Sequence, residues 1–245
     1  MMKNKFVKMA LVALLAGQLQ AATPTVVGFD GGSDDGFTGN AFFEAAGGNP
    51  DGNAHHFAQI FFNEIRTGGL GEPANPDLLG DYSALGPFTL SLDIKVDSIT
   101  DFIGNEIVRP IGFSLRDRDI QGPSGDSGVF FTLDDISSFT HGEWTTLSVT
   151  VDDPTSSSLP PGWIGFGDED PNTFEPILPA GASFASVLAG VDELQITGAV
   201  PGFFFTFANY DLRIDNITLS AVPEPSCGCL WLLGLLGLRF CRRGH

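Results

Sequence analysis

The alternation of apolar and polar residues is the feature of this sequence that most constrains its fold. Phe88, Leu90, Leu92, Ile94 and Val96 are separated by single polar residues. The same period of two recurs in residues 111–115, 129–133, 147–151, 194–196 and 203–207. Side chains of an extended strand point alternately to opposite faces, so each stretch predicts a strand with one buried and one solvated face.

Turn-forming segments separate these stretches, and they read "GPF", "QGPSGDSG", "HGE" and "DDPTSSSLPPG". Short alternating strands punctuated by Gly, Pro and Asp are typical of antiparallel sheets that stack face to face. The sequence therefore predicts an all-β antiparallel sandwich or jelly roll. In a chain of 245 residues that is 42% hydrophobic, a single domain of about 200 residues would suffice.

One segment follows a helical period instead. Phe184, Val187, Leu188 and Val191 are spaced i, i+3, i+4 and i+7, and Ser183 precedes them as a candidate N-cap. This spacing predicts one short amphipathic helix. Residues 31–87 are rich in Gly, Asn and Asp and look irregular, although "HHFAQIFFNEI" within them predicts one or two strands.

The charge of the chain is unevenly distributed. The formal net charge is −18, and all 30 Asp and Glu residues lie between Asp30 and Glu224. Half of the 12 Lys and Arg residues lie outside that span. Such an acidic surface repels nucleic acid and anionic lipid, and it suits divalent cations, a saline medium or cationic partners. We therefore expect no nucleic-acid partner.

Residues 1–22 predict a secretory signal peptide. Residues 1–8 are basic, residues 9–16 ("MALVALLA") are apolar, and Ala21 and Ala22 are small residues suited to a cleavage site. The alternative is a permanent N-terminal anchor, which requires about 20 apolar residues, and this run is much shorter. We expect the chain to be exported.

Residues 221–245 form a second segment whose composition predicts a role in moving the chain across a membrane. Pro223 and Pro225 keep "VPEPS" extended, and an apolar run follows at residues 230–238. The terminal arginines that come next resist crossing a membrane and stay on its cytoplasmic side. All three cysteines lie in this tail, so the domain before it is neither a disulfide scaffold nor a cysteine-ligated zinc module.

The tail resembles the PEP-CTERM sorting signal of Gram-negative bacteria that export extracellular polysaccharide, although its apolar run is shorter. The resemblance implies transient contact with the inner membrane, recognition by an exosortase-type membrane protease and delivery to the cell surface or extracellular matrix. The residues that carry it are Pro223, Glu224, Pro225, Arg239, Arg242 and Arg243.

The body of the chain, residues 23–220, resembles the laminin B (domain IV) module and its bacterial relatives. The matching segments, in order, are residues 78–96, 142–151, 162–163, 184–198 and 212–219. The family implies a jelly roll of the galactose-binding-like kind and a non-catalytic role in adhesion or in a matrix. The family has no agreed ligand-binding site, so the resemblance assigns no ligand-binding residues to this chain.

Asp215, in "LRIDNITL", is the acidic residue with the most constrained surroundings. In a regular strand it shares a face with Ile217 and Leu219, whereas a bulge at Asp215–Asn216 would change the register. A buried carboxylate costs several kcal/mol unless it is paired. Galactose-binding-like modules place such an Asp on a structural Ca²⁺ with oxygens from the first strand, here Asp30. Alternatively, Asp215 only accepts hydrogen bonds from loop N–H groups.

The sequence contains no recognisable catalytic motif. GxSxG, HExxH, P-loop and GxGxxG patterns are absent. His55 and His56 are adjacent, so on a strand they point to opposite faces and cannot ligate one metal together. Trp163 follows "LPP" in a predicted loop and is the better exposed candidate for stacking on a sugar, whereas the laminin B resemblance implies a packing role for it.

These observations favour an exported, surface-sorted, non-catalytic β-sandwich that is a structural or adhesive component of an exopolysaccharide matrix. Two other functions stay open. One is a specific carbohydrate-binding module, with extracellular polysaccharide as partner. The other is a secreted glycan hydrolase on the same scaffold.

Overall fold

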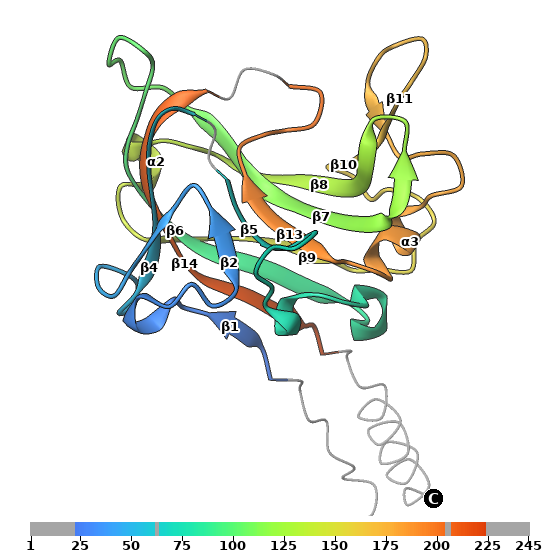
Figure 1. Cartoon of the computed structure of the whole chain (residues 1–245), viewed down its shortest axis with the longest axis horizontal. Helices are drawn as coiled ribbons and strands as arrows, with labels where there is room; N and C mark the ends of the chain where they lie inside the picture. The colour runs from blue at the N-terminus through green and yellow to red at the C-terminus, as the bar shows by residue number, and fades with distance from the viewer. Residues whose placement is uncertain (1–22, 62–63, 204–206, 224–245) are drawn as a thin grey trace, which may run out of the picture.

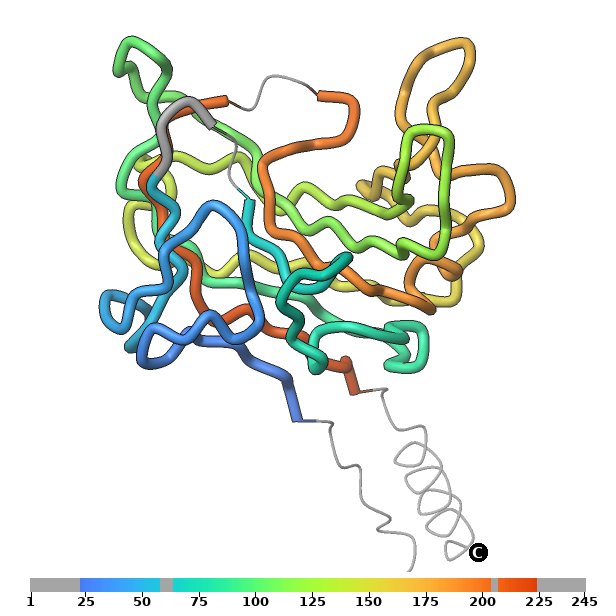
Figure 2. Tube along the Cα trace, viewed as in Figure 1, coloured from blue at the N-terminus to red at the C-terminus, as the bar shows by residue number. Residues whose placement is uncertain are grey.

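The computed structural model describes residues 23–61, 64–203 and 207–223 (Figures 1 and 2). Within these ranges the strands form two six-stranded sheets and a separate two-stranded ribbon, with antiparallel pairing throughout. The predicted all-β sandwich is thereby confirmed. The predicted signal peptide and residues 224–245 of the predicted sorting tail lie outside the described residues. No helix in the described ranges combines the length and apolarity needed to cross a bilayer.

The first sheet, sheet A, has two long strands at its centre. Its strand order is β3-β4-β14-β6-β9, and β1 also pairs with β14. The strands are β1 (Thr25–Val27), β3 (Phe42–Glu44), β4 (Asn53–Phe61), β6 (Phe88–Thr100), β9 (Thr145–Val151) and β14 (Ala208–Ala221). The last strand in chain order thus lies in the middle of the sheet.

The second sheet, sheet B, has the order β10-β8-β7-β13-β5-β2. Its strands are β2 (Phe37–Gly39), β5 (Glu64–Gly68), β7 (Arg109–Gly122), β8 (Gly125–Ile136), β10 (Trp163–Phe166) and β13 (Glu193–Thr197). The ribbon pairs β11 (Asp168–Glu169) with β12 (Pro176–Ile177) and directly follows β10. The β7–β8 hairpin and the ribbon rise together at one end of sheet B (Figure 1).

The core lies between the two sheets and includes alternating residues from the predicted stretches 88–96, 111–115, 129–133, 147–151 and 194–196. Of the predicted strand at 203–207, residues 204–206 lie outside the described residues. Leu90, Leu92 and Ile94 on β6 are fully buried, as are Leu194 and Ile196 on β13. Their polar neighbours along the strands point to the outer faces of the sheets. Burial of one such side chain contributes roughly 1.5–3 kcal/mol, so the core is the main source of stability.

The predicted helix is confirmed as α3 (Phe184–Leu188). Ser183 is its N-cap, because the Ser183 side chain accepts from the Ser186 N–H and the Ser186 hydroxyl accepts from the Ser183 N–H. Phe184 and Val187 are fully buried, and the helix packs against β7 and β8. Four single-turn elements were not predicted, because one turn carries no measurable period: η1 (Asp30–Gly32), η2 (Pro76–Leu78), η3 (Tyr82–Leu85) and α2 (Ser138–His141).

The described chain enters and leaves the sandwich at the same end. Thr25 on β1 pairs with Leu219 on β14. The loop between β6 and β7 and the ribbon with β11 lie at the far end of the molecule (Figure 1).

Candidate functional site

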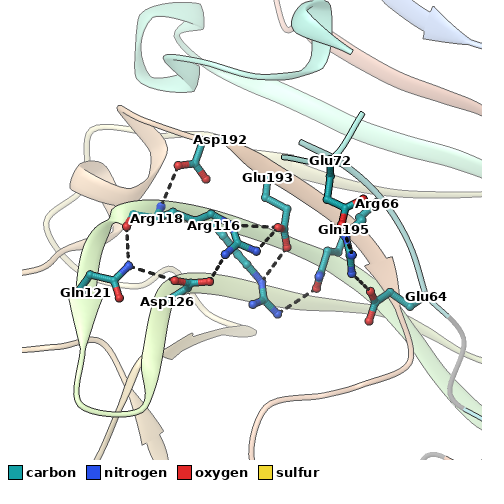
Figure 3. A network of polar contacts seen from close by, with 10 residues as sticks. All are labelled: Glu64, Arg66, Glu72, Arg116, Arg118, Gln121, Asp126, Asp192, Glu193 and Gln195. Atoms are coloured by element: carbon teal, nitrogen blue, oxygen red, sulfur yellow. Dashed lines mark hydrogen bonds and ion pairs between the residues drawn. The ribbon is translucent and has the colours of Figure 1, made fainter. Parts of the chain in front are cut away.

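The outer face of sheet B carries an extended polar network (Figure 3). Strand pairing builds it, because Glu193 on β13 lies opposite Arg116 on β7, and Gln195 lies opposite Arg66 on β5. The residues of the network are Glu64, Arg66, Glu72, Arg116, Arg118, Gln121, Asp126, Asp192, Glu193 and Gln195.

Glu193 is the centre of this network and has no solvent-exposed surface. Its Oε2 accepts from Nε of Arg118 at 3.1 Å and also from Nη2 of Arg118. Its Oε1 lies 3.4 Å from Nε of Arg116, whose Nη2 donates to Gln195 at 3.0 Å. Burial lowers the pKa of Arg116, and the Glu193 carboxylate acts against that shift. The two arginines and Glu193 therefore hold one another in fixed positions.

A pocket of about 460 Å³ lies at one end of this network. The Arg116 guanidinium lies 5.1 Å from the centre of the Phe166 ring, and both residues line the pocket. Asp126 from the β7–β8 hairpin and Asp168 and Glu169 from β11 contribute carboxylates. The pocket thus combines an aromatic ring, a guanidinium and three carboxylates.

Sequence reasoning missed this pocket. Arg116 and Asp168 belong to the acidic segments "RDRD" and "GDEDPN", whose composition is typical of solvated turns, whereas in the structure both residues lie on strands. The alternation along residues 111–115 does place Arg116 on the outward face of β7. The approach of β11 to β7 depends on tertiary packing, so no local pattern could reveal it.

Asp215 lies at a β-bulge, as one of the two sequence interpretations proposed. The register of β14 against β6 shifts between Asp215 and Thr218, and Asn216 has a φ of 49° in the left-handed region. Ile214 and Ile217 are three residues apart, so on a regular strand their side chains would point to opposite faces. The bulge allows both side chains to be fully buried on the core side. Asp215 itself is also fully buried.

The Asp215 carboxylate accepts hydrogen bonds from loop N–H groups, as the alternative interpretation also predicted. Its oxygens accept from the backbone N–H of Asn49 at 2.5 Å and of Asn216 at 2.7 Å. Burial raises the pKa of Asp215 to about 6, and the nearby charges of Asp93 and Asp30 add to that effect. The structure therefore holds a desolvated carboxylate next to two others.

Asp30, Asp215 and Asn216 together offer oxygens of the kind that Ca²⁺ prefers. Their Oδ1 atoms lie 3.6–3.7 Å from the point that a Cβ on Gly28 would occupy. Across the described ranges, no group of three or more His, Cys, Asp or Glu side chains is placed to hold a metal ion. A calcium site here would therefore use the Asn216 amide and backbone or water oxygens besides the two carboxylates, and this donor chemistry fits the ion.

Trp163 is not an exposed loop residue; it packs in the core, which is the alternative role that the sequence left open. Its side chain begins β10, points inward and is 7% exposed. The ring lies 5.3 Å from the Phe131 ring and 5.1 Å from the Phe184 ring, measured between centroids. The expectation of a loop tryptophan was wrong because the strand begins at Trp163. A ligand contact by this residue stays a prediction.

His55 and His56 point to opposite faces of β4, as expected. His56 is fully buried, and its Nδ1 lies 2.5 Å from the carbonyl oxygen of Asn40. His55 is on the outer face, with its ring nitrogens 2.9 Å from Glu44 and 2.8 Å from Asp211. The pair therefore forms polar contacts with different elements and no shared site.

No protein-family model matches the chain, and none of the curated proteins is significantly similar to it. Solved structures with a similar fold include an exo-β-agarase (TM-score 0.46, 15% identity). The alignment covers 82% of this chain and 25% of the agarase chain. Another is the xylan-binding domain from CBM 22 (TM-score 0.40, 9% identity), where the alignment covers 84% of this chain and 99% of that domain. A third is the C-terminal family 22 carbohydrate-binding module of Clostridium thermocellum Xyn10B (TM-score 0.39, 8% identity), where the alignment covers 80% of this chain and 92% of that module. These similarities assign neither a family nor a ligand to this chain.

Proposed function

We propose that this chain is a non-catalytic β-sandwich protein that binds extracellular polysaccharide in the pocket on the outer face of sheet B. The observation that carries the proposal is the pocket itself, in which Phe166, Arg116 and three carboxylates line a volume of about 460 Å³. Pockets of roughly 300–1,000 Å³ with a few fixed polar groups are typical of small-molecule sites.

The lining of the pocket suits a sugar because a sugar ring presents both hydroxyls and apolar C–H groups. Asp168 and Glu169 can accept hydrogen bonds from hydroxyls, and bonds to ionised groups are stronger than neutral ones. Phe166 offers an apolar surface to C–H groups. Glu193 and Gln195 hold the Arg116 side chain in place, so little conformational freedom is lost on binding.

Replacing Glu169 by alanine is expected to weaken polysaccharide binding about tenfold or more. A hydrogen bond to a charged group contributes roughly 1.5–3 kcal/mol, and 1.4 kcal/mol is a factor of ten in Kd. The measurement is affinity electrophoresis of the full chain in gels containing xylan, agarose or a soluble β-glucan. Glu175→Ala is the matched control, because Glu175 is exposed in the same hairpin and does not line the pocket.

Two results would contradict the proposal. Equal retardation of Glu169→Ala and Glu175→Ala would mean that the polysaccharide does not use this pocket. Release of reducing sugar from any of the three polysaccharides by the wild-type chain would mean that the protein is a hydrolase.

We further propose that Asp30, Asp215 and Asn216 hold a structural Ca²⁺. The buried Asp215 and its neighbours Asp93 and Asp30 support this, because a cation would offset their mutual repulsion. The ion would supply positive charge and would link the segment around Gly28 to β14. Asn49, which donates to both Asp215 and Asp93, would hold the adjoining loop against the site.

We also propose that the chain is exported and sorted to the cell surface or extracellular matrix of a Gram-negative bacterium. The predicted signal peptide at residues 1–22 and the tail with Pro223, Glu224, Pro225, Arg239, Arg242 and Arg243 support this. An exosortase-type protease would be the partner, with transient membrane contact through the tail. The laminin B resemblance supports an adhesive or structural role in the matrix.

Intact-mass spectrometry of the protein recovered from the cell surface tests the sorting proposal. We expect a mass that lacks residues 1–22 and lacks the apolar run and the arginines of the tail. A surface protein that retains both ends would contradict it, as would recovery of the full-length chain from the cytosol.

A further inference from the structure

A second pocket, of about 480 Å³, lies at one open side of the sandwich. Strands β9 and β10 are the terminal strands of sheets A and B on this side, since each has a single partner strand among the described residues. The loop between them, with Pro160 and Pro161, completes the pocket. Unlike the first pocket, it is reached from the side of the sandwich.

The lining of this second pocket matches a hydroxyl-rich ligand. Ser148 and Thr150 project from β9 toward solvent, because the alternate residues Val149 and Val151 are buried in the core. Phe131 and Trp163 also line the pocket; both side chains pack against the core, and their ring centroids lie 5.3 Å apart. Hydroxyls and aromatic carbon in one lining would contact the two kinds of surface that a sugar ring presents.

The charge of the lining selects among saccharides. Asp152 and Asp153 line the second pocket, and no Lys or Arg of the described residues does so. Two carboxylates repel the carboxylate of a uronic acid and accept hydrogen bonds from hydroxyls. The ligand class that fits is therefore a neutral saccharide.

Strand β10 separates the two pockets. Trp163 and Phe166 are three residues apart, so their side chains point to opposite faces of the strand. Trp163 lines the second pocket and Phe166 lines the first, and the two linings share no residue. Both pockets can therefore be occupied at the same time.

We infer that the second pocket binds a neutral saccharide, so that each chain holds two polysaccharide strands and cross-links them. This inference rests on the proposed function of the first pocket. Two sites on one rigid domain join separate polymer chains into a network, and the network gains strength from multivalency without any added contact. A protein that cross-links polysaccharide strands binds carbohydrate and is at the same time a structural component of the matrix.

The test combines binding stoichiometry with a cross-linking measurement on the full chain. Isothermal titration with xylohexaose, cellohexaose and agarohexaose should give two sites per wild-type chain for the saccharide that binds. Ser148→Arg fills the second pocket and should leave one site, whereas Glu169→Ala should leave two sites, one of them weakened about tenfold or more. The rise in viscosity that wild-type protein causes in a solution of the matching polysaccharide should be lost in Ser148→Arg and reduced in Glu169→Ala.

Ser157→Arg is the matched control, because Ser157 is exposed in the β9–β10 loop and does not line the pocket. Thr150→Arg is a second blocking variant in case Ser148→Arg does not fold. Two sites retained in a folded blocking variant, or one site in the wild type that Glu169→Ala weakens, would overturn the second pocket and leave the first intact. One site that survives Glu169→Ala and is lost in Ser148→Arg would overturn the first pocket, and binding of none of the saccharides would overturn both.

Discussion

Replacing Glu193 by alanine is expected to lower the free energy of unfolding by about 3–5 kcal/mol, which is the usual cost of removing one partner from a buried ion pair. Glu193 is fully buried, and its carboxylate contacts Arg118 through two nitrogens and lies next to Arg116. Without it, the two guanidinium groups repel each other across a partly desolvated space. The measurement is equilibrium unfolding in urea, compared with wild type at the same pH.

Glu72→Ala is the matched control for this prediction. Glu72 lies 3.5 Å from Arg66, but its side chain is 38% exposed. Exposed ion pairs contribute about 0–1 kcal/mol, so the midpoint should hardly move. If Glu193→Ala were no more destabilising than Glu72→Ala, the buried network on sheet B would not have the energetic role that its geometry indicates.

Asp215 is expected to make the metal-free protein less stable as the pH rises from about 4 to about 6. Its pKa is raised from 3.8 to about 6 in the folded chain, so in this window the folded state binds more protons than the unfolded state. The stabilisation is fully present below the unfolded pKa and is lost as the pH passes the folded pKa. A shift of this size corresponds to about 3 kcal/mol.

The measurement is thermal unfolding across this pH range with a chelator present, followed by addition of Ca²⁺ at pH 7. Asp215→Asn should remove the slope, whereas Asp135→Asn, at an exposed position on β8, should retain it. Ca²⁺ should raise the Tm of the wild type and leave that of Asp215→Asn unchanged. A wild-type Tm that Ca²⁺ does not affect would contradict the proposed site, and an unchanged slope in Asp215→Asn would contradict the burial of this carboxylate.

The sequence predicted the long elements of the fold because each carries its own period. The alternation from Phe88 to Val96 is long enough to define β6, and the spacing of Phe184, Val187 and Leu188 defines α3. Strands such as β2 and β3 have three residues each, which is too short for any period to be measured. They exist because neighbouring strands offer hydrogen bonds to them.

A candidate site was predictable from the sequence only where a residue type disagreed with the local pattern of apolar and polar residues. Asp215 was found because a carboxylate among alternating apolar residues requires an explanation, and the bulge provides one. The Glu193–Arg116 pair and the pocket beside Phe166 bring together residues from different strands, and the sequence contains no signal for that pairing. Trp163 was misplaced because the beginning of a four-residue strand cannot be located from composition alone.

The central position of β14 in sheet A determines when the domain can fold. This strand pairs with β1, β4 and β6, so the sheet lacks its middle until residue 221 is available. Contacts between distant parts of a chain form slowly, because a large loop must close first. The strands of sheet B all precede β14 in the chain, so sheet A is the layer that is completed last. The two-layer core can therefore close only after nearly the whole chain has been synthesised.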